Sequence, residues 1–370
     1  MADPKPNVRL IASYLPQYHP IPENDAWWGK GFTEWTNAGK AKPLYKGHYQ
    51  PKVPADLGYY DLRVPEVREA QAEMAKEYGI EAFCYWHYWF GNGKRLLERP
   101  FNEVVSSGKP DFPFCLGWAN ETWDLPWLGS RNKILIEQLY PGKEDHISHF
   151  NTMLPAFRDH RYLRVDGKLL FMVYLPFQLP EPAAFMELWQ ELARKNGLGG
   201  FYFIGQTTHY QKIAEILKMG FDAVNTVRIL DIDHGNLIRR LWKVARPKEL
   251  RLFSYEKAVR FFVGQEEGAE NVIPTIIPNF DHSPRSGRKG YIFHGSTPEI
   301  FRIHVKQVFD LIRHKPAEHR ISFIKSWNEW GEGNYLEPDL VYGKGFLEVI
   351  RELAMENKNN STGQSGASHK

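Results

Sequence analysis

The stretch "RISFIKSWNEW", residues 320–330, changes character near its midpoint. The part "ISFI" is short and rich in β-branched and aromatic residues, which is typical of a β-strand. The part "KSWNEW" follows at once and carries polar and aromatic side chains. Parallel sheets in α/β barrels carry their functional groups where a strand ends. The stretch therefore predicts a buried strand whose end holds reactive side chains.

Seven further runs of this kind precede it, at residues 9–16, 80–90, 112–120, 168–176, 200–207, 221–226 and 271–280. Several are apolar at successive positions, as expected for strands of a parallel sheet that is covered on its outer side. Helix-like segments with a three-to-four-residue apolar period lie between them, at 64–79, 181–197 and 297–315. The alternation predicts an α/β fold, a (β/α)8 TIM barrel.

We expect one barrel domain over residues 9–354, preceded by an extension at 1–8 and followed by a disordered polar tail at 355–370. Two long loops interrupt the alternation, after strand 1 (19–61) and after strand 6 (227–265). Loops of this length in a compact domain are usually functional. No G-x-G-x-x-G or P-loop motif occurs, which excludes the common dinucleotide and nucleoside triphosphate sites.

The second long loop carries two charged features. A basic cluster is either a solvated helix face or a site for an anionic substrate or lipid head group; its members are Arg239, Arg240, Lys243, Arg246, Lys248 and Arg251. The acids of "DIDH" resemble the D-x-D of metal-dependent sugar transferases, but two acids at this spacing are frequent by chance and a solvated loop is the preferred explanation; the residues are Asp231, Asp233 and His234. The sequence shows no other metal motif, and we expect neither a metal nor a cofactor.

Composition narrows the class of protein. Of 370 residues 42% are hydrophobic and 25% charged, and the net charge of +3 gives no basic field for nucleic acid. Cys84 and Cys115 lie in apolar runs, which predicts buried reduced thiols. No apolar run is long enough for a transmembrane segment and no signal peptide is visible, so we expect a cytoplasmic protein, or a periplasmic or secreted one if a signal has been removed.

Aromatic residues reach 14% of the chain, which predicts either a large aromatic core or a cleft whose rings stack on sugars. Many of them occur with polar residues near the expected strand ends and in the first long loop. We take as candidate substrate-binding residues Tyr14, Trp28, Glu34, Trp35, His87, Trp89, Trp118, Asn120, Glu121, Trp123, Asn279, Trp327 and Asn328. His87 fits a packed, hydrogen-bonded histidine as well as a ligand for substrate.

Carboxylates in an aromatic cleft are what cleavage of a glycosidic bond needs. Glu329 and Glu332 are three residues apart, and they can converge only if the chain turns at Gly331. We predict that this pair is catalytic. Glu121 either caps the turn after the third strand or takes part in binding or catalysis, and the sequence leaves both open.

Four motifs together resemble the WbsX-like branch of glycoside hydrolase family 99: "YLPQYHPIPENDAWWGKGFTEWTN", "YWHYWF" with "GKRLLERP", "GWANETW" and "WNEWGEGNYLEP". The resemblance runs from about Arg9 to about Leu353. It implies a (β/α)8 barrel and a retaining, endo-acting hydrolase of α-mannosidic or related rhamnose-type linkages in a polysaccharide. It also implies a place among lipopolysaccharide or O-antigen proteins of bacteria.

The resemblance further implies a 1,2-anhydro-sugar intermediate, with Glu329 as the base for the 2-hydroxyl and Glu332 as the acid. Two other functions stay open. One is a glycosyltransferase of surface polysaccharide biosynthesis, for which the "DIDH" segment and the basic cluster would supply a donor site. The other is a carbohydrate-binding barrel without catalysis. The partner in each case is an oligosaccharide or polysaccharide, and the oligomeric state is not predicted.

Overall fold

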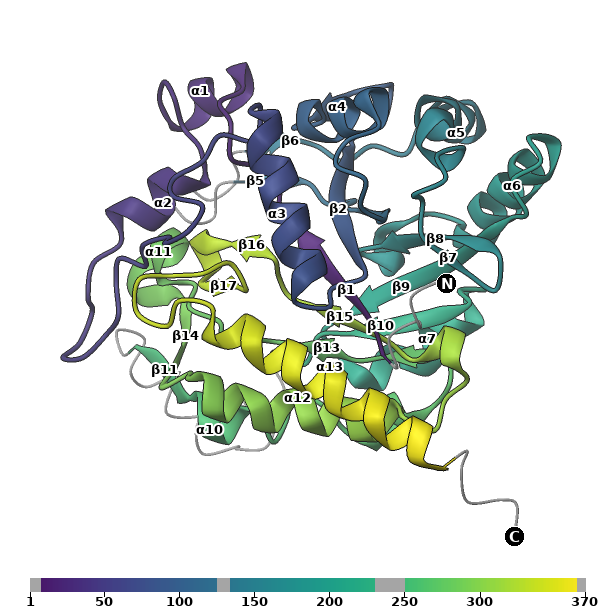
Figure 1. Ribbon diagram of the computed structural model, residues 1–370. Helices are drawn as coiled ribbons and strands as arrows, with labels where there is room; N and C mark the ends of the chain where they lie inside the picture. The colour runs from purple at the N-terminus through teal and green to yellow at the C-terminus, as the bar shows by residue number, and fades with distance from the viewer. Residues whose placement is uncertain (1–7, 125–133, 230–249, 365–370) are drawn as a thin grey trace, which may run out of the picture.

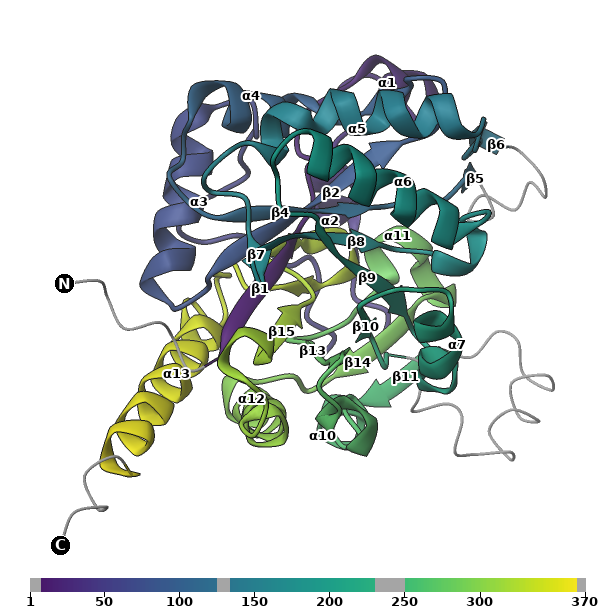
Figure 2. The ribbon, with the colours of Figure 1, turned by 90° about the vertical axis from the view of Figure 1, so that its right-hand side faces the viewer.

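The computed structural model of the chain describes residues 8–124, 134–229 and 250–364. One parallel sheet forms its centre (Figures 1 and 2). In spatial order its strands are β12 (Val272–Ile273), β10 (Ala223–Thr226), β9 (Phe201–Thr207), β8 (Lys168–Val173), β4 (Phe114–Trp118), β2 (Ala82–Trp89), β1 (Arg9–Tyr14), β15 (Ile321–Ile324) and β13 (Thr275–Ile276). Every neighbouring pair in this order is parallel.

The sheet closes into a barrel at Pro274. β12 and β13 lie on either side of this proline, and they pair with opposite ends of the sheet, β10 and β15. Proline has no N–H to donate, so one strand becomes two short ones. The predicted run 271–280 is therefore corrected to two strands that end at Ile276. The predicted run 320–330 likewise ends as a barrel strand at Ile324.

Helices lie outside the strands and alternate with them along the chain (Figure 1). They are α3 (Pro65–Glu77), α4 (Arg99–Ser107), α5 (Lys143–Phe157), α6 (Pro182–Lys195), α7 (Ile213–Lys218), α10 (Tyr255–Ala258), α12 (Pro298–Ile312) and α13 (Gly345–Gln364). Short strands β3 (Arg95–Leu96), β5 (Trp123–Asp124), β6 (Ile134–Ile136) and β7 (Arg164–Val165) decorate the loops. The predicted (β/α)8 barrel is confirmed.

The long loop after β1 contains two helices, α1 (Pro22–Trp28) and α2 (Glu34–Lys40). The Trp35 indole donates a hydrogen bond to the carbonyl of Tyr60 at 2.8 Å, which ties α2 to the far end of the loop. Figure 1 shows α2 beside α11 (Ser283–Ser286), a short helix that follows β13 and β12 in the chain. The loop after β1 thus places α2 next to α11, which lies in the loop after the seventh barrel strand.

The second long loop is only partly described. The acids of "DIDH" and the basic residues from Arg239 to Lys248 lie outside the described residues. Past them, β11 (Arg251–Ser254) pairs in parallel with β14 (Tyr291–His294), a small second sheet that the sequence did not predict. Phe253 of β11 and Phe293 of β14 belong to an apolar cluster that is separate from the barrel core. This cluster explains why apolar residues recur there without belonging to the barrel.

Helix α13 continues to Gln364, so the expectation of a disordered tail from 355 onward is corrected for 355–364. Extending an existing helix fixes one residue for each new hydrogen bond, which even a polar segment can sustain. None of the helices in the described ranges combines the length and apolar composition needed to cross a lipid bilayer.

Much of the aromatic excess lies in the interior. The largest fully buried side chains include Trp89, Trp118, Trp189, Trp327 and Trp330. Cys84 and Cys115 are buried, unbridged, and lie opposite each other on β2 and β4, so the predicted reduced thiols are confirmed. Of the two explanations for the aromatic content, the large core accounts for these five tryptophans.

Candidate active site

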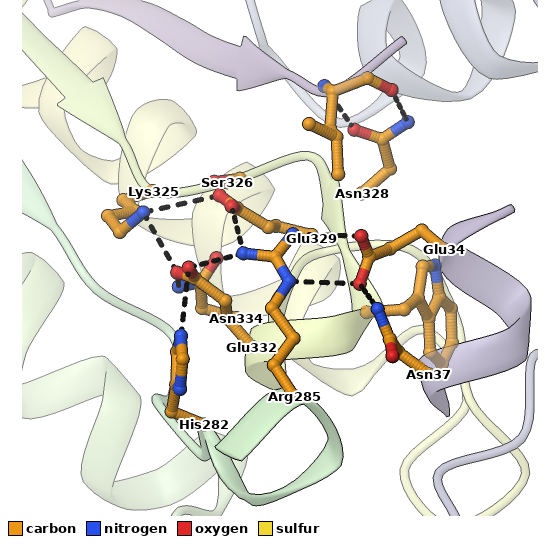
Figure 3. Close-up of polar contacts among 12 residues, drawn as sticks. Glu34, Asn37, His282, Arg285, Lys325, Ser326, Asn328, Glu329, Glu332 and Asn334 are labelled. Carbon is orange, nitrogen blue, oxygen red and sulfur yellow. Dashed lines mark hydrogen bonds and ion pairs between the residues drawn. The ribbon is translucent and has the colours of Figure 1, made fainter. Parts of the chain in front are cut away.

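The carboxylates of Glu329 and Glu332 meet at one guanidinium group. β16 (Asn328–Glu329) leads into a single 3-10 turn over Trp330–Glu332, and β17 (Asn334–Tyr335) returns antiparallel to β16. The Arg285 Nη1 nitrogen donates to Glu329 Oε1 at 3.3 Å and also to Glu332 Oε1. Figure 3 shows both carboxylates pointing toward this nitrogen. The turn therefore does what the spacing requires, because it brings the two acids to one place.

A second cation, Lys325, lies beside both carboxylates. Lys325 directly follows β15, and its Nζ lies 3.2 Å from Glu329 Oε2 and 3.3 Å from Glu332 Oε2. The Ser326 hydroxyl donates to Glu329 Oε2 at 3.0 Å. Each glutamate thus shares one oxygen with Arg285 and the other with Lys325. Two carboxylates can lie this close because two cations offset their repulsion.

Arg285 is anchored from the other side by Glu34 of α2. Its Nε and Nη2 nitrogens donate to Glu34 Oε1 and Oε2 at 2.9 and 3.0 Å, a two-pronged bond that fixes the plane of the guanidinium. Asn37 donates to Glu34 Oε1 at 2.9 Å. Glu34 is 1% exposed, so it acts on Arg285 and not on a bound substrate. This placement corrects the expectation that Glu34 binds sugar.

Gly331 is required by this anchor. A Cβ atom at residue 331 would lie 1.8 Å from Glu34 Oε1, far inside van der Waals contact. The sequence predicts Gly331 as the residue that permits the turn. The structure adds that the missing side chain leaves room for a carboxylate from another loop.

The electrostatics of the two acids follow from these contacts. Burial acts to raise the pKa of Glu332, but Lys325, Arg285 and His282 outweigh it and hold that pKa well below its usual range. His282 Nε2 lies 3.5 Å from Glu332 Oε1, and the Asn334 amide donates to Glu332 Oε2 at 3.3 Å. Glu332 is therefore ionised in the free site at neutral pH.

Glu121 differs from the pair in charge. Burial raises its pKa to about 7, and repulsion from Glu332 and Glu329 adds to this, although Arg285 and Lys325 oppose it. It lies in the loop after β4, and its backbone N–H donates to Ala119 at 3.0 Å. A carboxyl that senses both acids and titrates near neutrality is a candidate proton donor. Both alternatives for Glu121, a cap of the turn and a part in binding or catalysis, stay predictions.

Several predicted binding residues lie in the interior, where they cannot touch substrate, and these expectations are corrected. Exposed fractions are 0% or 1% for Tyr14, Trp118, Asn120, Trp327 and Asn328. The Asn328 amide exchanges two hydrogen bonds with the backbone of Leu15, at 2.8 and 3.1 Å, and so acts as an extra rung between β16 and the end of β1. Asn120 similarly bonds the backbone of Leu175. These side chains hold the strand ends in place.

His87 and Trp89 also belong to the interior. His87 Nε2 lies 2.7 Å from His149 Nε2, and burial lowers the pKa of His87 well below its usual value. The Trp89 indole donates to Asp145 at 2.9 Å and stacks on His149. Of the alternatives for His87, the packed histidine is the one the structure shows.

The remaining aromatic candidates are half-buried and lie in loops. Trp28 stacks on Phe32 with ring centres 5.6 Å apart, and Trp123 meets the Tyr88 ring edge-on at 5.1 Å. Trp35 packs against Trp330 of the motif at 5.5 Å. Asn279 lines a cavity on the other side of Gly333. These four stay predictions as substrate-binding residues.

Sequence reasoning missed both cations. Lys325 had a signal, because it is the first residue after a barrel strand and lies in the quoted stretch. Arg285 had none, because its helix is short and its partners lie far away in sequence, on α2 and β16. Within the described ranges no group of three or more histidine, cysteine or acidic side chains could hold a metal ion.

The fold is shared with solved glycoside hydrolases. An endo-alpha-mannosidase of glycoside hydrolase family 99 from Bacteroides thetaiotaomicron matches with a TM-score of 0.60 and 15% identity, covering 96% of this chain and 98% of that one. A structure described as a glycoside hydrolase-like protein gives a TM-score of 0.59 at 17% identity, covering 95% and 97%.

Sequence relatives are closer. The protein named "Uncharacterized protein WxcX" of Xanthomonas campestris pv. campestris strain B100 is 38% identical over 344 residues, which is 93% of this chain and 49% of that protein. Its counterpart in strain ATCC 33913 is 37% identical over 358 residues, again 93% and 49%. The chain thus spans about half the length of these curated relatives. A family model matches residues 10–350, so the chain belongs to the family described as Glycosyltransferase WbsX.

Proposed function

We propose that the protein is a retaining, endo-acting glycoside hydrolase that cleaves α-mannosidic or related rhamnose-type linkages in a polysaccharide. The observation that carries this proposal is the meeting of Glu329 and Glu332 at Arg285 Nη1. Two carboxylates on one side of a site suit a base and an acid acting on one sugar ring. They suit less a nucleophile and an acid on opposite faces of that ring.

The proposed first step needs no enzyme nucleophile. Glu329 takes the proton of the 2-hydroxyl, O2 attacks the anomeric carbon, and the bond to the leaving oxygen breaks as Glu332 protonates that oxygen. The product is a 1,2-anhydro sugar. In the second step Glu332 takes a proton from water, the water oxygen attacks the anomeric carbon, the bond between that carbon and O2 breaks, and Glu329 returns its proton to O2. Two inversions give net retention.

In the free site Glu332 is ionised, so it holds no proton to give to the leaving oxygen in the first step. A substrate that weakens the contact between Glu332 and Arg285 would raise the pKa of this carboxyl and let it hold a proton. Arg285 would keep its two hydrogen bonds to Glu34 if that contact were lost. Glu121, whose pKa is about 7, is the neighbouring group that can hold a proton at neutral pH.

A digestion screen tests the reaction. Wild-type protein is incubated with mannose- and rhamnose-containing polysaccharides, and released oligosaccharides are identified by mass spectrometry. We expect release by the wild type and by Glu348→Gln, an exposed change on α13, but not by Glu329→Gln or Glu332→Gln. A substrate methylated at the reacting 2-hydroxyl should resist cleavage, and unimpaired cleavage would exclude the anhydro-sugar route.

The second candidate is a glycosyltransferase, which the description of the family favours. It needs an activated sugar donor, and the residues that could bind the phosphates of such a donor lie largely outside the described residues. The same assay separates the two. Sugar transfer that requires a nucleotide sugar and a divalent ion, with no release of oligosaccharide, would support the transferase and contradict the hydrolase.

A further inference from the structure

A cavity of about 370 Å³ lies behind the catalytic turn. Its walls come from the first long loop, from residues between Pro278 and Ser296 that include the end of β14, and from residues that follow Glu332. The backbone N–H of Asp281, a wall residue, donates to the carbonyl of Glu332 at 2.7 Å. The segment that begins at Gly333 therefore lines the cavity and directly follows Glu332 of the acid pair.

Lys52 gives the cavity unused hydrogen-bond donors. It is 5% exposed, and within the described part of the chain its ammonium group has one hydrogen-bond acceptor, the carbonyl of Gly333 at 3.2 Å. An ammonium carries three N–H groups. Burial lowers the pKa of Lys52, and attraction from Asp281 and Asp339 opposes this. A buried cation with spare donors that line a cavity calls for oxygen acceptors there.

Asn279 gives the cavity an unused acceptor. Its Oδ1 oxygen is buried and has no hydrogen-bond partner among the residues that the structure describes. The two acids that line the cavity, Asp281 and Asp339, already have hydrogen-bond donors. Asp281 accepts from His48 and Gln50 at 2.7 Å and from the Ser283 backbone at 3.0 Å. The Asp339 carboxylate likewise accepts hydrogen bonds from the Tyr335 hydroxyl and from two backbone N–H groups.

The unused donors of Lys52 and the unused acceptor of Asn279 indicate which kind of ligand the cavity would bind. Two bound carboxylates, Asp281 and Asp339, offset the charge of Lys52, so a free anion gains little there. Spare donors and a spare acceptor together fit hydroxyl groups, which both accept and donate. Half-buried tyrosine rings, among them Tyr45 and Tyr49, supply apolar faces for the C–H side of a sugar.

We propose that this cavity is a second carbohydrate site, which binds one neutral, hydroxyl-rich sugar unit back to back with the catalytic pair. The inference rests on the proposed function for the identity of the sugar. The unit is either a residue of the polysaccharide substrate or a free sugar. Because Gly333 and Tyr335 form its wall, occupancy of the site bears directly on the segment that positions Glu332.

Binding is measured with the full chain carrying Glu329→Gln and Glu332→Gln, so that no sugar is consumed. Methyl α-D-mannopyranoside, methyl α-L-rhamnopyranoside and inorganic phosphate are titrated by calorimetry, and crystals soaked in each sugar locate it. We expect a sugar in the cavity, and an affinity about tenfold weaker in Asn279→Ala. Lys52→Met should act in the same direction, and Asn151→Ala, an exposed change on α5, should leave binding unchanged.

Comparison with oligosaccharides identifies the source of the sugar. Tighter binding of a tetrasaccharide than of the monosaccharide, weakened by Asn279→Ala, assigns the site to the substrate chain; equal binding assigns it to a free sugar. Binding of phosphate but of neither sugar overturns the proposal, as does binding that Asn279→Ala leaves intact. Failure of the proposed function is a separate result, because it appears as absence of cleavage by the wild type whether or not the cavity binds sugar.

Discussion

Glu332 and Glu337 lie five positions apart in one motif and have opposite environments. Glu332 meets the cations Lys325 and Arg285, which hold its pKa well below the usual range. Burial raises the pKa of Glu337 to about 7, although neutral donors counteract it. Those donors are the Trp330 indole at 2.7 Å, the Tyr60 hydroxyl at 2.9 Å and the Gln71 amide at 2.6 Å.

The two glutamates show how one turn can serve chemistry and stability at once. Charged partners keep Glu332 ionised at the edge of a partly exposed site, where its side chain is 14% exposed. Neutral partners let Glu337 form a buried hub that joins the motif to α3 and the first loop. Three side chains converge on Glu337, so it does more than an ordinary loop residue.

Exchanging each glutamate for glutamine should separate the roles, and the largest effect concerns activity. Glu332→Gln removes a proton donor and should lower kcat for polysaccharide cleavage by about 10²–10⁴-fold. Glu337→Gln should keep most of the activity of whatever protein remains folded. Initial rates at equal concentrations of folded protein check this. Equal loss in both variants would mean that the motif is purely structural.

The next largest effect is expected when the ion pair between Glu34 and Arg285, beside Glu332, is disturbed. Gly331→Ala places a Cβ 1.8 Å from the present position of Glu34 Oε1, so the fork between Glu34 and Arg285 must shift. We expect kcat/KM to fall by about 10²-fold, since a displaced catalytic contact commonly costs that much. The matched control is Gly39→Ala on α2, where nothing lies within 4 Å of the added atom. An active Gly331→Ala protein would show that the fork is dispensable.

A smaller effect concerns stability on the buried side. Glu337→Gln replaces one acceptor oxygen by an NH2 group, which turns toward a donor and leaves a buried hydrogen bond unmade. The expected loss is about 1–3 kcal/mol in the free energy of unfolding, measured by urea denaturation. Glu348→Gln on the exposed face of α13 should change it little.

The sequence predicted the barrel because its strands are apolar and regularly spaced, a local property that any covered parallel strand must have. The proximity of Glu329 and Glu332 is also a local property. The two residues are three positions apart, and a turn at Gly331 brings their side chains together. The sequence did not predict Arg285, which is held by contacts with α2 and β16 that only the closed barrel creates. It also assigned interior residues such as Trp118 to binding, because a strand end looks alike whether its side chain points inward or outward.

The smallest effect is a pH dependence of stability, and it has opposite signs for the two glutamates. The folded-state pKa of Glu337 is about 7, above the value of about 4.3 for an unfolded glutamate. Its folded form holds the extra proton between these values, so its stabilising contribution is present below about 4.3 and is lost as the pH rises through about 7. The folded-state pKa of Glu332 is depressed, so its contribution is present above about 4.3 and is lost as the pH falls below that value.

Free energies of unfolding measured from pH 3 to pH 9 should therefore show two slopes, to which each titrating proton contributes at most about 1.4 kcal/mol per pH unit. Glu337→Gln should flatten the slope between about pH 4.3 and 7, where Glu121 also contributes because its pKa is about 7. Glu332→Gln should flatten the acid slope, and it should also reduce the Glu121 share of the other slope because repulsion from Glu332 helps raise the pKa of Glu121. If Glu337→Gln flattened the acid slope instead, the division of the motif into a charged and a neutral side would be wrong.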